Sequence, residues 1–239
     1  MENIFFQSAP ILRNTFLNDP LLQAFLKQTV PEQHRPWSRQ LQSVGEKAAG
    51  PWLQLARDIE KNPPRHIAYS AWGQRTDEVQ VHPSWQELTN EAAREGIVAH
   101  AYERKHGEWS RLHQMSLLYL FHSSSGFVSC PLAMTDGAAR VLELMGSTPQ
   151  QIAALQNLVT QDPNEFWTSG QWMTERGGGS DVSGTRTSAR EGRDGKFNLF
   201  GEKWFTSAIN SQMSLALAKI EKSGIAEDEL SLFFIRIRD

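Results

Sequence analysis

The spacing of apolar residues changes once along the 239-residue chain, near Asp162-Pro163. Before this point they recur mostly every three or four positions, which indicates helices that bury one face. After it, short runs rich in β-branched and aromatic residues lie between turn residues, which is typical of strands. We therefore predict an α+β fold: an N-terminal α-helical bundle over residues 1–160, followed by a partial antiparallel β-barrel or sandwich domain over residues 161–239.

Two helix starts in the first region are well marked. Ser84 and Glu87 have the spacing of a capping box, in which each side chain satisfies a backbone N–H group. Thr148 and Gln151 repeat this spacing around Pro149, which lacks only an N–H that the first turn does not use. We predict helices over 19–29, 36–48, 51–61, 84–104, 109–120 and 131–145, and from Pro149 onward.

Strands are predicted in the second region. Segments 185–190 and 197–205 flank the turn sequence Gly-Arg-Asp-Gly-Lys and predict a hairpin. Segments 213–220 and 230–237 predict two further strands. The last one is strongly apolar and ends at the chain terminus. An uncovered apolar sheet edge tends to associate with other chains. We therefore expect the chain to be incomplete or to assemble with a partner.

The composition excludes several classes of function. A formal net charge of −3 gives no general attraction to nucleic acid, so we do not expect such a partner. Cys130 is the only cysteine, and the seven histidines form no HExxH motif, so no metal site is predicted. The apolar tract 115–133 is interrupted by polar residues and proline, which argues against a membrane span. A cytoplasmic location is the default expectation, with mitochondrion and peroxisome left open.

The stretch QWMTERGGGSDV, residues 171–182, places three glycines in succession. A dinucleotide-binding GxGxxG motif needs a following helix, which is not predicted here, and no Gly-Lys-Ser/Thr closes the run as in a P-loop. Small residues let backbone N–H groups approach an anion or a flat ring, with hydroxyls from Thr174 and Ser180 on either side. A flavin cofactor has both features, a planar ring system that accepts hydrogen bonds and an anionic pyrophosphate. The alternative interpretation of the glycine run is a flexible hairpin or bulge without a ligand.

A second stretch, GEKWFTS at residues 201–207, follows downstream. We predict that it lies on a strand, where side chains alternate between faces. Phe205 and Ser207 would then share one face, and Trp204 and Thr206 the other. An aromatic ring and a hydroxyl on one face could shelter a cofactor ring, although core packing is the other interpretation.

The two stretches in this order resemble the flavin-binding middle domain of acyl-CoA dehydrogenases, whose pattern is TEPxAGSD followed by GxKxWIT. Arg176 replaces the usual proline and Phe205 the usual tryptophan, which resembles the AidB-like group. The upstream sequences NPPR at 62–65, GQRTD at 73–77 and HPSW at 82–85 are also similar to that group.

This resemblance implies an FAD-binding flavoprotein that acts on an acyl-CoA or a related small molecule by α,β-dehydrogenation. It also implies a catalytic glutamate in a C-terminal helical domain, so we expect no catalytic residue in this chain and a fragment or truncated form, inactive alone. Glu175 is expected to be structural. The alternative is a non-catalytic FAD- or fatty-acyl-binding module, and the full-length form is expected to be a homo-oligomer. The predicted cofactor-binding residues are Met173, Thr174, Gly178, Gly179, Ser180, Phe205, Thr206 and Ser207.

Overall fold

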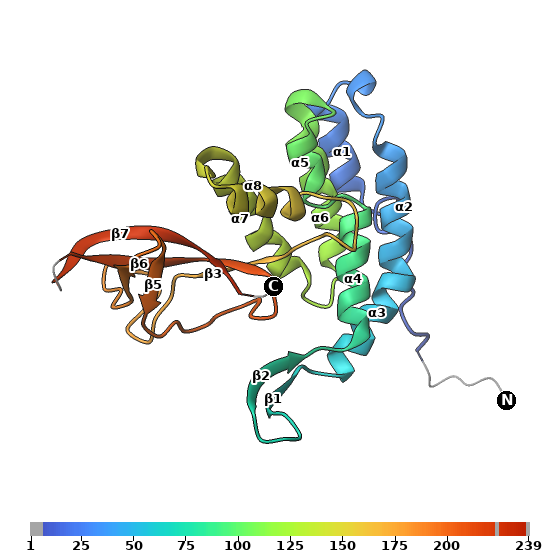
Figure 1. Cartoon of the computed structure of the whole chain (residues 1–239). Helices are drawn as coiled ribbons and strands as arrows, with labels where there is room; N and C mark the ends of the chain where they lie inside the picture. Colours follow the sequence, from blue (N-terminus) through green and yellow to red (C-terminus); the bar gives the residue numbers. More distant parts are fainter. Residues whose placement is uncertain (1–6, 223–224, 238–239) are drawn as a thin grey trace.

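The computed structural model describes residues 7–222 and 225–237 of the chain. A bundle of helices occupies one side of the molecule and a twisted sheet the other, with α7 and α8 between them (Figure 1). The helices are α1 Pro20–Thr29, α2 Ser38–Ala49, α3 Pro51–Lys61, α4 Pro83–Arg94, α5 Ala99–Glu103, α6 Ser110–His122, α7 Ser129–Met145 and α8 Pro149–Leu158, with short 3-10 turns at Glu32–His34 and Gly107–Trp109.

The helix starts follow the sequence signals in one case and differ in the other. At α8, Thr148 and Gln151 form the predicted capping box. At α4 the cap is His82, whose ring Nδ1 accepts a hydrogen bond from the backbone N–H of Ser84, so the capping box predicted at Ser84 is wrong. The helix predicted over 84–104 is divided into α4 and α5 because Gly96 adopts φ +64°, a conformation that favours glycine and ends the helix.

A two-stranded hairpin interrupts the helical region, where no strand was predicted. Strands β1 Arg65–Tyr69 and β2 Arg75–Gln80 pair antiparallel and project from the ends of α3 and α4 as an arm (Figure 1). Nearly all their residues are exposed, so the strands lack the alternation of apolar and polar residues that marks a half-buried sheet.

The second region is an open mixed sheet formed by β3 Ser169–Trp172, β4 Ser188–Glu191, β5 Phe197–Phe200, β6 Met213–Lys222 and β7 Ile225–Arg236. The predicted hairpin is present as β4 and β5. Strand β6 pairs antiparallel with β7 but parallel with both β3 and β4. The α+β class is therefore confirmed, whereas the sheet is neither wholly antiparallel nor a closed barrel.

Two apolar cores hold these parts together. The larger lies inside the helical bundle and includes Leu41, Trp52 and Phe121. The smaller joins α7 and α8 to the sheet, and Leu142 of α7 and Met213 of β6 are both part of it. Since β6 contributes to this second core, the sheet is anchored to the helices by apolar contact.

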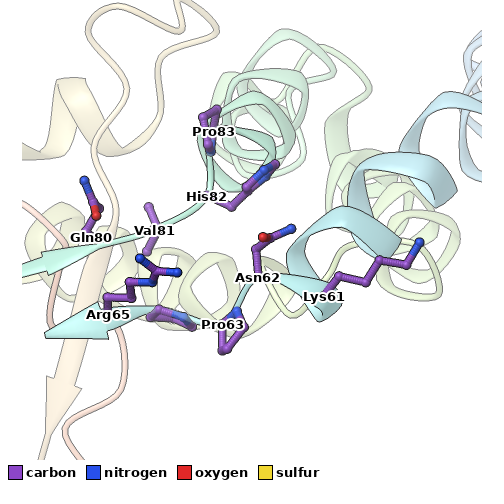
Figure 2. A pocket seen from close by; sticks show the side chains of 9 residues that line it. Lys61, Asn62, Pro63, Arg65, Gln80, Val81, His82 and Pro83 are labelled. Atoms are coloured by element: carbon purple, nitrogen blue, oxygen red, sulfur yellow. The ribbon is translucent and has the colours of Figure 1, made fainter.

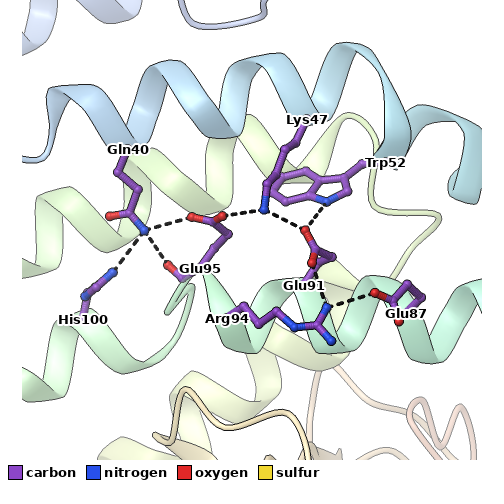
Figure 3. A network of polar contacts seen from close by, with 8 residues as sticks. All are labelled: Gln40, Lys47, Trp52, Glu87, Glu91, Arg94, Glu95 and His100. Atoms are coloured by element: carbon purple, nitrogen blue, oxygen red, sulfur yellow. Dashed lines mark hydrogen bonds and ion pairs between the residues drawn. The ribbon is translucent and has the colours of Figure 1, made fainter.

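A half-buried polar network braces the larger core from one side (Figure 3). Lys47 of α2 pairs with Glu91 of α4 at 2.9 Å and with Glu95, the residue that follows α4, at 2.8 Å, and Trp52 Nε1 donates to Glu91 at 3.0 Å. Partly buried ion pairs thus join α2 to α4, and the Trp52 hydrogen bond joins α3 to the same network. Within the described residues, no helix combines the length and apolar character needed to cross a membrane.

Candidate functional site

The two stretches selected from the sequence lie side by side in the structure. The backbone N–H of Trp204 donates to the carbonyl of Thr174 at 2.9 Å. The indole Nε1 of Trp172 donates to the carbonyl of Ser207 at 3.1 Å. Residues 172–174 and 204–207 are thus joined by direct hydrogen bonds, as the predicted cofactor site requires. We call residues 172–182 the glycine segment and residues 201–207 the aromatic segment.

The aromatic segment is not a strand, so the predicted alternation of its side chains is wrong. Strand β5 ends at Phe200, and residues 201–210 form bends and turns. Phe205 and Ala208 have φ of +55° and +57°, which no extended strand contains. The Phe205 residue is 80% exposed. An exposed aromatic ring in a conformation that is uncommon for a side-chain-bearing residue is a candidate ligand contact.

The glycine segment turns tightly immediately after Thr174. Glu175 and Gly178 exchange backbone hydrogen bonds at 3.2 and 3.0 Å, and Gly178 adopts φ +148°. A Cβ on Gly179 would lie 2.6 Å from the Thr174 hydroxyl, so only glycine lets the chain pass this close. A Cβ on Gly177 or Gly178 would meet nothing, which leaves the backbone there open to a ligand.

Four hydroxyl groups of the two segments make no hydrogen bond to the described part of the protein. They belong to Thr174, Ser180, Thr206 and Ser207, and all four residues are exposed or half-buried. The two segments therefore present several hydrogen-bond donors that the protein itself does not use.

Glu175 anchors the glycine segment from inside. Its carboxylate accepts hydrogen bonds from the backbone N–H groups of Arg186 and Thr187, from the Thr187 hydroxyl and from Lys203 Nζ at 2.8 Å. Partial burial alone would raise the pKa of Glu175, but these donors, Lys203 first among them, lower that pKa to about 2. The expected structural role of Glu175 agrees with this geometry.

Lys203 was not selected from the sequence. The signal that could have identified it is its charge, opposite to that of Glu175, within the motif that accompanies the glycine stretch. Met173 is half-buried and packs against the second core, so only part of its side chain can face a ligand.

Helix α7 supports the glycine segment from the helical side. The Thr135 hydroxyl accepts a hydrogen bond from Ser169 N at 3.0 Å and donates to Pro131 O at 2.7 Å. Gln171 Nε2 lies 2.7 Å from where a Cβ on Gly137 would be, so β3 approaches the helix closely. These contacts fix the strand that leads directly into the segment.

An apolar groove of about 720 Å³ lies elsewhere on the helical region. The segment before α1, one face of α6 and the first turns of α7 form its walls. Its lining includes Leu12, Met115, Leu118, Tyr119, Phe127, Cys130 and Ala133.

A smaller hollow of about 390 Å³ lies at the base of the β1–β2 arm, between residues 61–65 and 80–83 (Figure 2). Lys61 extends away from Arg65 in this hollow, so its two cationic side chains do not converge on one point (Figure 2).

Comparison with known proteins gives two family matches that divide the chain. Residues 7–162 match the family described as adaptive response protein AidB N-terminal domain, and residues 170–239 match acyl-CoA dehydrogenase, middle domain. The second match contains both the glycine and the aromatic segment.

Three similar proteins extend the comparison. Acyl-CoA dehydrogenase family member 11 of Caenorhabditis elegans is 38% identical over 98% of this chain and 40% of its own length. The crystal structure of the C. elegans protein ACDH-11 in complex with C11-CoA covers all of this chain and 42% of its own, at 38% identity and TM-score 0.93. The structure named Bd2924 apo-form is 46% identical over 98% of this chain and 48% of its own, with TM-score 0.92. The chain thus spans less than half the length of each.

Proposed function

The chain belongs to the acyl-CoA dehydrogenase family, in its AidB-like branch, and from this membership we propose that it forms the FAD-binding part of a flavoprotein acting on an acyl thioester. The observation that carries the proposal is the pairing of the glycine and aromatic segments, in which four hydroxyls make no hydrogen bond to any group in the described part of the chain. A planar, hydrogen-bonding cofactor uses such an arrangement.

The residues present fit FAD in their chemistry. The hydroxyls of Thr174, Thr206 and Ser207 would bond the polar edge of the flavin ring, and Phe205 would cover its apolar surface. The open backbone at Gly178 and the adjoining Gly179, which packs closely against Thr174, would approach the ring edge or the pyrophosphate together with Ser180, while Met173 would contact the ring in part. FAD, when bound, would supply the hydride acceptor for α,β-dehydrogenation.

An acyl-CoA is the proposed substrate class. The C. elegans relative has been crystallised in complex with C11-CoA, which supports acyl-thioester binding in the family. The apolar groove lined by Met115, Tyr119 and Phe127 is a suitable place for an acyl chain, because its walls carry few polar groups.

The choice between a dehydrogenase and a non-catalytic FAD- or fatty-acyl-binding module depends on a proton acceptor. Glu175 is unsuited to accept the substrate α proton, because four hydrogen bonds occupy its carboxylate and its pKa is about 2. We assign no catalytic residue to this chain. The same proposal includes a domain boundary between residues 160 and 161, a homo-oligomeric assembly and a cytoplasmic location.

A titration with FAD tests the proposal. We expect the purified protein to bind FAD with a shift of its visible absorption bands, and acyl-CoA added to the complex to bleach those bands if the protein is a dehydrogenase. Persistent bands would show that this chain binds FAD but does not itself dehydrogenate the substrate. Failure to bind FAD at all would contradict both the dehydrogenase and the binding module.

A further inference from the structure

We propose that two ion pairs of opposite polarity, Glu175–Lys203 and Arg176–Glu202, fix the register between the glycine and aromatic segments and so position the cofactor-binding residues. The inference rests on the proposed function for the identity of the ligand. Its structural part, the register, can be tested without any ligand.

The segments run antiparallel in one consistent register. Thr174 is bonded to Trp204, Glu175 is paired with Lys203, and Arg176 is paired with Glu202. Three hydrogen bonds join the segments at a backbone carbonyl: Trp204 N to Thr174 O, Trp172 Nε1 to Ser207 O and, at 3.5 Å, Lys203 Nζ to Met173 O. Only the first joins two backbone groups, and neither segment belongs to a strand beyond Trp172, the last residue of β3. A β-ladder would hold the register by repeated backbone bonds, so here side chains must supply the specificity.

The order of the charged residues in the two segments disfavours both registers that differ from the native one by a single residue. A slip of one residue in one direction would place Glu175 opposite Glu202, and a slip in the other would place Arg176 opposite Lys203. Like charges that face each other directly are destabilising. The native register is therefore the one of these three that pairs opposite charges in both positions.

The inner and outer pairs differ in environment. Glu175 and Lys203 side chains are only 11% and 10% exposed, with 2.8 Å between Oε1 and Nζ, so breaking the pair leaves a partly buried charge. Arg176 Nε lies 2.6 Å from Glu202 Oε1, and both side chains are exposed. The Arg176 guanidinium also lies 4.6 Å from the centre of the Trp204 ring.

Arg176 thus holds Trp204, the residue next to Phe205, whereas Lys203 holds Glu175, the residue next to Thr174. The two ion pairs act on the ligand only through these neighbours, so all four residues are positioning residues. Arg176 makes both contacts through its guanidinium, the ion pair with Glu202 and the contact with the Trp204 ring.

The experiment uses Glu175→Gln and Arg176→Met, with Arg176→Lys as the conservative variant. Arg190→Met is a matched control, since Arg190 pairs with Glu221 and lies 4.8 Å from the Phe200 ring, outside both segments. The first readout is hydrogen exchange of the peptide that contains the Trp204 amide, in the ligand-free protein. The others are the FAD dissociation constant and the visible bands of bound FAD.

We expect Glu175→Gln to speed exchange at the Trp204 amide and to weaken FAD binding at least tenfold. Arg176→Met should do so about threefold and shift the visible bands, Arg176→Lys should restore exchange and binding in part, and Arg190→Met should change nothing. Unchanged Trp204 exchange in the exposed Arg176→Met variant would overturn the register role. Faster exchange with unchanged FAD binding would overturn the positioning role. If the wild type binds no FAD, the proposed function fails, while the exchange result still decides the register.

Discussion

The helical bundle and the cofactor segments are held together by different forces. In the bundle, large side chains such as Leu41, Trp52 and Phe121 are essentially inaccessible to solvent. In the glycine and aromatic segments, Phe205 is mostly exposed and the connections are hydrogen bonds and ion pairs. Burial therefore determines the shape of the first region, and directional polar contacts determine that of the second.

This difference predicts which property a substitution in each region will change, the free energy of unfolding or ligand binding. A change in the bundle removes apolar contact and should lower the free energy of unfolding. A change in the two segments should alter ligand binding while leaving most of the free energy of unfolding intact, because little apolar area is involved. The predictions below test this division, beginning with the largest effect.

Trp52→Ala should lower the free energy of unfolding by about 3–5 kcal/mol, because it opens a cavity in the larger core. Trp52 is 1% exposed and packs edge-on against Phe121, with ring centres 5.1 Å apart. Urea unfolding measures the effect. Trp72→Ala is the control, since Trp72 on the β1–β2 arm is 91% exposed. A loss below about 1 kcal/mol at position 52 would contradict burial as the main force in the bundle.

Acidification should weaken the bundle through His113. This buried ring stacks on Trp37 and His100, with centres 4.8 and 4.6 Å away, and His106 lies edge-on at 5.2 Å. Neither ring nitrogen has a hydrogen-bond partner in the described structure. Burial first, and then the charges that His100 and His106 would carry, lower the pKa of His113 from 6.5 to about 3.

The sign follows from proton binding. Between pH 6.5 and about 3 the unfolded chain binds a proton at His113 that the folded protein does not, so stability is lost as the pH falls through this window. His113→Phe should remove a few kcal/mol of this acid sensitivity. Around the stack, Lys105 adds positive charge and Glu103, bonded to His100, adds negative charge. Denaturant unfolding at pH 4 and 7 measures the effect, with His34→Phe as an exposed control; equal pH dependence in wild type and variant would refute it.

Thr187→Val should cost about 1.5–3 kcal/mol, the usual range for a hydrogen bond to a charged group. The Thr187 hydroxyl donates to Glu175, and Thr187 is buried. Thr185→Val is the matched control, because Thr185 is almost as buried and its hydroxyl does not contribute to the hydrogen bonds of Glu175. Equal losses of stability in the two variants would mean that this polar contact does not matter.

Thr174→Val should weaken FAD binding by about 1 kcal/mol, close to fivefold, if its hydroxyl bonds the ring. Thr174→Ser retains the hydroxyl and should bind nearly as well as the wild type. Equilibrium titration by flavin fluorescence measures both. Unchanged FAD affinity in the valine variant would remove Thr174 from the proposed contacts. A lowered free energy of unfolding in that variant would contradict the proposed difference between the two regions.

Sequence periodicity predicted the bundle well because burial of one helix face leaves a regular trace. It failed where the decisive feature leaves no such trace. The break at Gly96 and the exposed β1–β2 arm carry no apolar pattern, and the positive φ of Phe205 is hidden in a run whose aromatic residues favour a strand.

The candidate site was predicted as a pairing of two stretches, and that pairing is present. The ion pair between Lys203 and Glu175 was not predicted. It depends on an antiparallel register between the two segments, which the sequence alone does not establish because the paired residues are not in strands. The roles of the predicted cofactor-binding residues stay predictions.

The parallel pairing of β3 with β6 has a consequence for the order of folding. Ser169 of β3 lies opposite Met213 of β6, and both cofactor segments fall between these residues in the chain. Until that pair meets, the intervening polypeptide is an open loop whose ends must be brought together at an entropic cost. We therefore expect the bundle, rich in local contacts, to form early, and the cofactor-binding surface to be among the last parts to acquire its shape.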